Sequence, residues 1–197
     1  MKQLVSQELH SYWSGLKGAR LAPERNDIDL GAIRHLLANV FILQVDRSGR
    51  FPLEMCGTRI NAFRLADHKG RSFLDLWSEE DHTAIVRAIS TVTDETRPVV
   101  VGARSGAGDL PRLGVELILL PLRHFGKTHS LVLGALTPAG QPEWLGRRIA
   151  PALHVNSLRV LGSEQEAAVG RNPSRPRLVL HEGGKSANLA FEGIGAR

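Results

Sequence analysis

Three long runs of strand-forming residues limit the folds of this chain more than any other feature. They are PVVVGAR at 98–104, RLGVELILLPLR at 112–123 and THSLVLGALT at 128–137. Only a short loop and a short turn separate them, whereas parallel strands need a crossover of a dozen or more residues. We therefore expect an antiparallel sheet and an α+β fold.

Two shorter runs precede these strands. VFILQV at 40–45 and FPLEMC at 51–56 flank a four-residue turn that ends in Gly49, and this pattern predicts a β-hairpin. Gly57 follows at once and is expected to let the chain leave the second strand sharply.

Helices are expected before and after this hairpin. Short helices at 60–65 and 73–77 are separated by Gly70, and a capping box of Ser78 and Asp81 predicts the start of a longer helix. The inner face of that helix carries apolar residues at helical spacing, namely Ile85, Val86, Ile89 and Val92.

The first 38 residues show two helical patterns. One apolar stripe predicts a helix that ends at Gly18. The stripe consists of Val5, Leu9, Tyr12 and Leu16, and Trp13 lies beside it. Asp29 can cap a second helix, which would carry Leu30, Ile33, Leu36 and Leu37.

Composition excludes several classes of protein. The net charge of +5 comes from basic residues spread along the chain, which favours a solvated basic surface over a nucleic-acid site. The single cysteine, Cys56, cannot form an intrachain disulfide, which fits a reducing compartment. No signal peptide is visible, and the longest apolar run, 115–122, is too short to span a bilayer. We expect a cytoplasmic protein without a membrane span.

Several separated motifs resemble a bacterial subgroup of small PAS-domain proteins, over about residues 8–162. The opening pattern YW..L.G…AP.R.DID is matched by Tyr12-Trp13, Leu16, Gly18, Ala22-Pro23, Arg25 and Asp27-Ile28-Asp29. Further matches are RFPL…GTRI at 50–60, GRSFLDLW at 70–77, LLPL at 119–122 and LGAL at 133–136. The resemblance implies a five-stranded antiparallel sheet with short helices across one face, preceded by an N-terminal helical segment.

Four parts of the chain follow from this resemblance and from composition. We expect a helical segment at 1–38, the PAS core at 39–138, an extension at 139–162 that packs on or near the core, and a flexible tail at 163–197.

A search for catalytic chemistry finds none, so we do not expect an enzyme. Gly126-Lys127-Thr128 and the Gly-Gly-Lys-Ser at 183–186 lack the earlier glycine of a phosphate-binding loop. A G-x-S-x-G elbow and a pair of histidines at metal-binding spacing are both missing from the sequence.

The space between sheet and helices is the one candidate ligand site. Six residues are expected to point into it, although their spacing also suits an ordinary filled core: Phe63, Phe73, Trp77, Ile85, Ile89 and Leu119. Some PAS domains hold haem through a histidine on or near the long helix, and His82 is the weak candidate here. The simpler alternative is that His82 faces solvent beside the acidic residues that precede it. No cofactor is required by the sequence.

The N-terminal stripe offers a candidate interface of Leu9, Tyr12, Trp13 and Leu16. It can pack on its own sheet or against a second subunit, since PAS relatives often dimerise through helices at this place. No kinase, cyclase or helix-turn-helix output region is visible, so we predict a non-enzymatic signalling module that regulates a partner protein. The alternative is a small-molecule or haem sensor that uses the PAS cavity.

Overall fold

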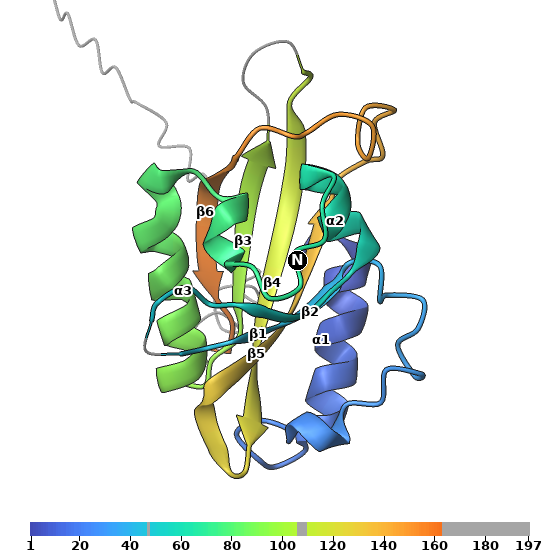
Figure 1. Ribbon diagram of the computed structural model, residues 1–197. Coiled ribbons are helices and arrows are strands. Elements are labelled where there is room, and N and C mark those ends of the chain that lie inside the picture. The colour runs from blue at the N-terminus through green and yellow to red at the C-terminus, as the bar shows by residue number, and fades with distance from the viewer. Residues whose placement is uncertain (47, 106–109, 163–197) are drawn as a thin grey trace, which may run out of the picture. The chain divides into compact units, whose positions relative to one another are not determined.

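The computed structural model describes residues 1–46, 48–105 and 110–162, and they form one antiparallel sheet with helices on both faces (Figure 1). The sheet order is β2-β1-β5-β4-β3-β6. The strands are β1 (Val40–Gln44), β2 (Leu53–Cys56), β3 (Val99–Ser105), β4 (Leu113–His124), β5 (Lys127–Pro138) and β6 (Leu153–Val160).

The antiparallel sheet predicted from the sequence is confirmed, with one strand more than expected. The extension at 139–162 supplies β6, which pairs with β3 from Leu153 opposite Ser105 to Val160 opposite Val99. Its outer residues are mostly exposed, so it lacks the apolar run that marks the central strands. The sheet therefore has six strands rather than five.

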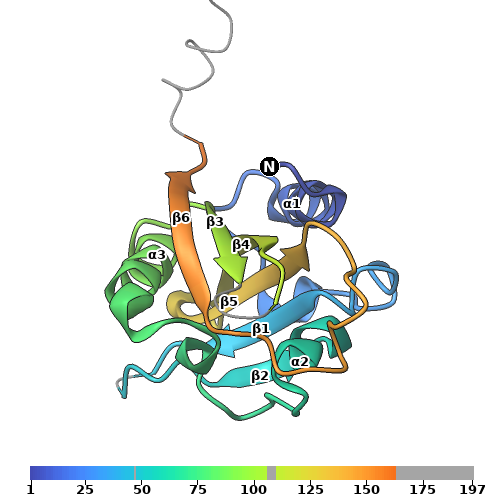
Figure 2. The ribbon, with the colours of Figure 1, turned by 90° about the horizontal axis from the view of Figure 1, so that it is seen from above.

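The helices divide between the two faces of the sheet, as Figure 2 shows. The inner face carries α2 (Thr58–Arg64), the 3-10 helices η2 (Phe73–Leu76) and η3 (Glu79–Asp81), and α3 (His82–Asp94). The opposite, outer face carries α1 (Leu4–Lys17), followed by the 3-10 helix η1 (Arg25–Asp27). Each face buries its own apolar cluster, so the sheet is covered by side chains on both sides.

The second N-terminal helix predicted from Asp29 does not form. Residues 30–39 make successive turns instead, with hydrogen bonds to the third residue back, such as Leu36 N to Ile33 O at 2.8 Å and Asn39 N to Leu36 O at 2.9 Å. The Asp29 carboxylate accepts a hydrogen bond from the amide of Gly31, so it caps a turn.

The predicted capping box of Ser78 and Asp81 is also wrong. The Ser78 side chain caps nothing, and the Asp81 carboxylate accepts a hydrogen bond from Val155 N of β6 at 3.2 Å. Asp81 therefore ties the start of α3 to the sixth strand, which the sequence pattern did not predict.

Gly57 has a different role from the one expected. Its φ of −69° is open to any residue, but an added Cβ would overlap the carbonyl oxygens of Leu37 and Ala38. The glycine is needed because two backbone segments approach closely at the start of α2.

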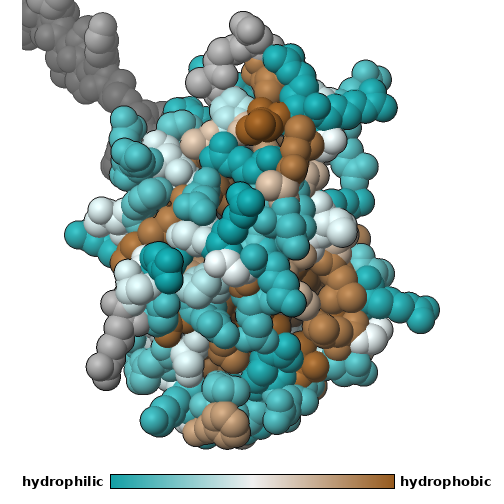
Figure 3. Space-filling model, viewed as in Figure 1, coloured by the Kyte–Doolittle hydropathy of each residue, from teal (hydrophilic) through white to brown (hydrophobic). Residues whose placement is uncertain are grey.

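No helix among the described residues is long and apolar enough to cross a membrane. The surface in Figure 3 is mostly hydrophilic, with separate apolar patches. The predicted tail, including its apolar stretch at 177–182, lies outside the described residues.

Candidate functional site: the N-terminal segment on the outer face of the sheet

The inner face brings the six candidate cavity residues into one apolar cluster. All of them are buried: Phe63, Phe73, Trp77, Ile85, Ile89 and Leu119. Aromatic rings pack against one another there, with centroids 5.0 Å apart for Phe41 and Phe73 and 6.0 Å apart for Phe73 and Trp77. In this packing the six side chains act as core, and a ligand-binding role for them stays a prediction.

His82 lies at the start of α3 and is half-buried. Its Nε2 lies 3.1 Å from the backbone oxygen of Leu74, so one ring nitrogen is engaged within the protein. The other ring nitrogen is not engaged by this contact, and a haem-ligand role for His82 stays a prediction.

On the outer face, α1 packs against its own sheet. Leu9 is fully buried and Trp13 is 3% exposed, whereas Tyr12 and Leu16 are half-buried. Their shared apolar cluster includes side chains of β4 and β5, among them Ile118, Leu120, Leu122, Leu131 and Leu133. An interface through the four candidate residues stays a prediction, and only two of them keep exposed surface for it.

Trp13 fills a gap in the hydrogen bonding of the sheet. The pairing of β3 with β4 ends at Leu119, so the remaining residues of β4 have no strand beside them on that side. The indole Nε1 of Trp13 donates to the backbone oxygen of Pro121 at 2.8 Å in a buried position. Proline lacks a backbone N–H, so Pro121 leaves no donor unpaired where β4 extends beyond β3.

The segment after α1 continues along the same edge of β4. Arg123 donates its backbone N–H to the oxygen of Pro23 at 2.8 Å, and its guanidinium lies 3.3 Å from the Glu24 carboxylate. Residues 23–24 thus run beside the end of β4 and satisfy groups that β3 leaves free.

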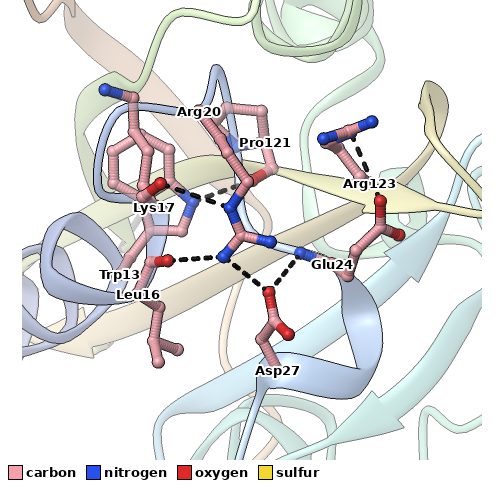
Figure 4. Close-up of polar contacts among 8 residues, drawn as sticks. All are labelled: Trp13, Leu16, Lys17, Arg20, Glu24, Asp27, Pro121 and Arg123. Atoms are coloured by element: carbon pink, nitrogen blue, oxygen red, sulfur yellow. Dashed lines mark hydrogen bonds and ion pairs between the residues drawn. The ribbon is translucent and has the colours of Figure 1, made fainter.

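Arg20 and Asp27 hold this segment in its path (Figure 4). The Arg20 guanidinium donates to the oxygen of Leu16 at 2.7 Å and lies 2.8 Å from the Asp27 carboxylate. Asp27 also accepts the amide of Glu24 at 2.9 Å, and that amide, together with Arg20, holds the pKa of Asp27 below its ordinary value. The end of α1, the loop and η1 are therefore cross-linked by polar contacts.

Tyr12 adds a further tie on the outer surface of α1. Its hydroxyl accepts a hydrogen bond from Asp29 N at 2.8 Å and donates to Asp29 O at 3.2 Å. These contacts give a structural reason for the separated residues of the opening motif. Its Trp and Pro positions attach α1 and the following loop to β4. Its Tyr and Asp positions hold that loop and the residues after it against α1 and against one another.

Sequence reasoning missed Glu116, the residue that holds the other end of α1. Its carboxylate lies on β4 and accepts the backbone amides of Lys2 at 2.7 Å and Gln3 at 3.1 Å, directly before the first turn of the helix. Burial raises the pKa of Glu116, but the Lys2 amide, with smaller effects of Ser6, the Gln3 amide and the amino terminus, outweighs it, so the pKa lies below the ordinary value. The available signal was a single acid within the apolar run VELILL.

The sheet, the helices across its inner face and the N-terminal cover define a module of the PAS class. The family model described as "PAS domain" matches residues 1–137, and the chain belongs to this family. A comparison with curated proteins gave no match. The family assignment makes the chain a sensory and signal-transduction module, and PAS domains commonly mediate protein interactions and dimerise.

Proposed function

We propose that this protein is a cytoplasmic, non-enzymatic signalling module that regulates partner proteins through protein–protein contacts. The outer sheet face and α1 form the responsive surface. A partner would favour one arrangement of α1 on the sheet over another, and this difference in affinity would carry the signal.

The attachment of α1 is the observation that supports this proposal. The helix is held at its start by Glu116, near its end by Trp13, and on its outer side by Tyr12. It belongs to no strand ladder, so loss of these few contacts can free the helix while the six strands keep their pairing. Its release would uncover the apolar outer face of β4 and β5.

A small-molecule sensor is the second candidate, and one buried atom favours it. The indole Nε1 of Trp77 has no hydrogen-bond partner although the residue is 3% exposed. A ligand with an acceptor atom would satisfy this donor if the inner cluster opened. An absorption spectrum and an intact-complex mass of the purified protein test this candidate, because a retained chromophore or added small mass would favour it.

The partner proposal is tested with two matched acid-to-amide variants of the full chain. Glu116→Gln removes the charge that holds α1, and Glu80→Gln removes an exposed acid near α3 as the control. We expect faster hydrogen exchange in α1 of Glu116→Gln alone. Quantitative affinity capture from the source organism should show a partner whose retention changes several-fold with Glu116→Gln and not with the control.

One combination of results would contradict this mechanism. If α1 exchanges faster in Glu116→Gln and every captured protein is retained equally by all three chains, then release of α1 does not govern binding, and the proposed mechanism is wrong.

A further inference from the structure

The outer side of the sheet carries a hollow that the attachment of α1 leaves open. It has a volume of about 430 Å³, and one wall is the face of α1 that presents His10, Trp13 and Lys17 at helical spacing. The other wall consists of residues 96–98, between α3 and β3, and residues 161–162, after β6. In Figure 2 the hollow lies at the edge that carries both the N-terminus and the end of β6. Trp13 belongs to the outer apolar cluster, so this hollow is separate from the inner cluster with its six candidate cavity residues.

The lining of the hollow is largely apolar. The rings of Trp13 and His10 lie 5.9 Å apart on α1, and the Leu161 N–H donates to Pro98 O at 2.7 Å, which joins the two segments of the other wall. Burial, with a smaller effect of the amino terminus, lowers the pKa of His10, so its ring is mostly uncharged at neutral pH and belongs to the apolar lining. Small-molecule sites typically have volumes of about 300–1,000 Å³ and an apolar lining with few polar groups. This hollow has both properties.

Two charged side chains are part of the described lining of the hollow, and both are basic. Arg97 lies 3.4 Å from the Glu95 carboxylate, so it already has a partner of opposite charge. The Lys17 ammonium lies 6.0 Å from the centroid of the Trp13 ring and has no acid within ion-pair distance among the residues that the structure describes. The hollow therefore offers one free positive charge beside an aromatic ring.

Backbone strain marks the rim of the hollow at Thr96. Its φ is +53°, a value that β-branched residues rarely adopt. The Thr96 hydroxyl donates to the adjacent Glu95 O at 2.7 Å, which is a local contact. Strained residues of this kind concentrate at ligand sites, so the position of Thr96 in the lining agrees with a binding role.

We propose that this hollow binds a small aromatic carboxylic acid. The flat apolar part of the ligand lies between the rings on α1 and the Pro98–Leu161 wall, and its carboxylate pairs with the Lys17 ammonium. An aromatic body is favoured over a flexible chain because a rigid ring loses little conformational entropy when it packs against other rings. An acid is favoured over a neutral compound because Lys17 is free to form a charge-assisted hydrogen bond. The inference goes beyond the proposed function, since it assigns a ligand to the outer face and requires no partner protein.

Isothermal titration calorimetry of the purified full chain tests the charge of the ligand. The probes are indole-3-acetate and its neutral amide, indole-3-acetamide, which differ only in the acid group. We expect the acid to bind wild type about tenfold more tightly than the amide. Lys17→Gln should remove most of this preference, whereas Lys127→Gln, a matched change of an exposed lysine outside the hollow, should keep it.

A second variant tests the position of the site. Leu161→Trp fills the hollow with a ring of its own and should weaken binding of indole-3-acetate about tenfold or more. Leu158→Trp is the matched control, because Leu158 lies on β6 outside the lining and is 40% exposed. If circular dichroism shows that Leu161→Trp folds poorly, His10→Trp fills the hollow from α1 instead.

Three results would each overturn the proposal. The first is a wild-type chain that does not bind indole-3-acetate at millimolar concentration. The second is equal binding of the acid and the amide, or an acid preference that Lys17→Gln retains. The third is binding that a folded Leu161→Trp leaves unchanged, because the acid would then occupy another site, such as the inner cluster. None of these results bears on the exchange of α1 in Glu116→Gln, so the proposed role of α1 keeps its own test.

Discussion

Replacement of Trp13 by Phe isolates the value of one hydrogen bond between α1 and the sheet. The variant keeps an aromatic ring under the helix and removes the N–H that reaches Pro121 O at 2.8 Å. The lost bond leaves a buried carbonyl without its partner, which costs about 1–3 kcal/mol of unfolding free energy. The smaller ring adds about 1 kcal/mol for the space it leaves. We therefore expect a loss of about 3 kcal/mol, measured by urea unfolding followed by far-ultraviolet circular dichroism.

Trp77 provides the matched control within the same chain. It is 3% exposed, as Trp13 is, but its Nε1 has no hydrogen-bond partner. Trp77→Phe therefore reduces the ring volume without breaking a hydrogen bond. It also removes an unsatisfied buried donor. We expect Trp13→Phe to be less stable than Trp77→Phe by about 2 kcal/mol, or about 4–8 °C in melting temperature for a chain of this size. Equal losses, or a larger loss at Trp77, would refute the role given to the Trp13 hydrogen bond.

Three further outcomes are expected. The folded-state pKa of Glu116 lies below its ordinary value of 4.5. The stability that its carboxylate contributes is therefore present above pH 4.5 and is lost as the pH falls through the folded pKa. Urea unfolding between pH 7 and pH 3 should show a weaker acid dependence for Glu116→Gln than for wild type. Gly57→Ala should lower the free energy of unfolding by about 2 kcal/mol or more, because the added Cβ overlaps two carbonyl oxygens. Gly15→Ala, on the open face of α1, should raise it by about 0.5–1 kcal/mol. Equal effects of the two variants in thermal unfolding would contradict the close approach at Gly57. Burial, with a smaller effect of Asp67, raises the pKa of the Cys56 thiol to about 12, so alkylation by iodoacetamide at pH 8 should be slow in the folded chain and fast in urea, and rapid labelling of the folded chain would contradict this environment.

The sheet was predictable because each central strand is marked by a local sequence pattern. Runs such as 112–123 are long and apolar, and the short turn at Gly126 fixes an antiparallel neighbour. The sixth strand was harder to predict, because β6 lies at an edge with mostly exposed outer residues and therefore lacks a continuous apolar pattern. The helix predicted from Asp29 failed because its side chain caps a turn as readily as a helix.

The contacts that fix α1 depend on residues far apart in the chain. The apolar stripe predicted the helix, but Trp13 and Pro121 are 108 positions apart, and Lys2 and Glu116 are 114 apart. No local pattern states which face of the sheet receives such a helix. The positive φ of Phe125 was hidden for another reason, since a sequence does not display the backbone conformation of a turn.

The edge of β4 beyond its pairing with β3 has a consequence for how the chain can be shortened. A truncated chain that begins at residue 39 would look like a complete PAS core, yet it would lose Trp13, Pro23 and Glu24 from that edge. The far end of β4 would then offer free backbone groups beside a bare apolar face. Such edges recruit strands from other molecules and lead to aggregation. We therefore expect residues 1–28 to protect the sheet against polymerisation.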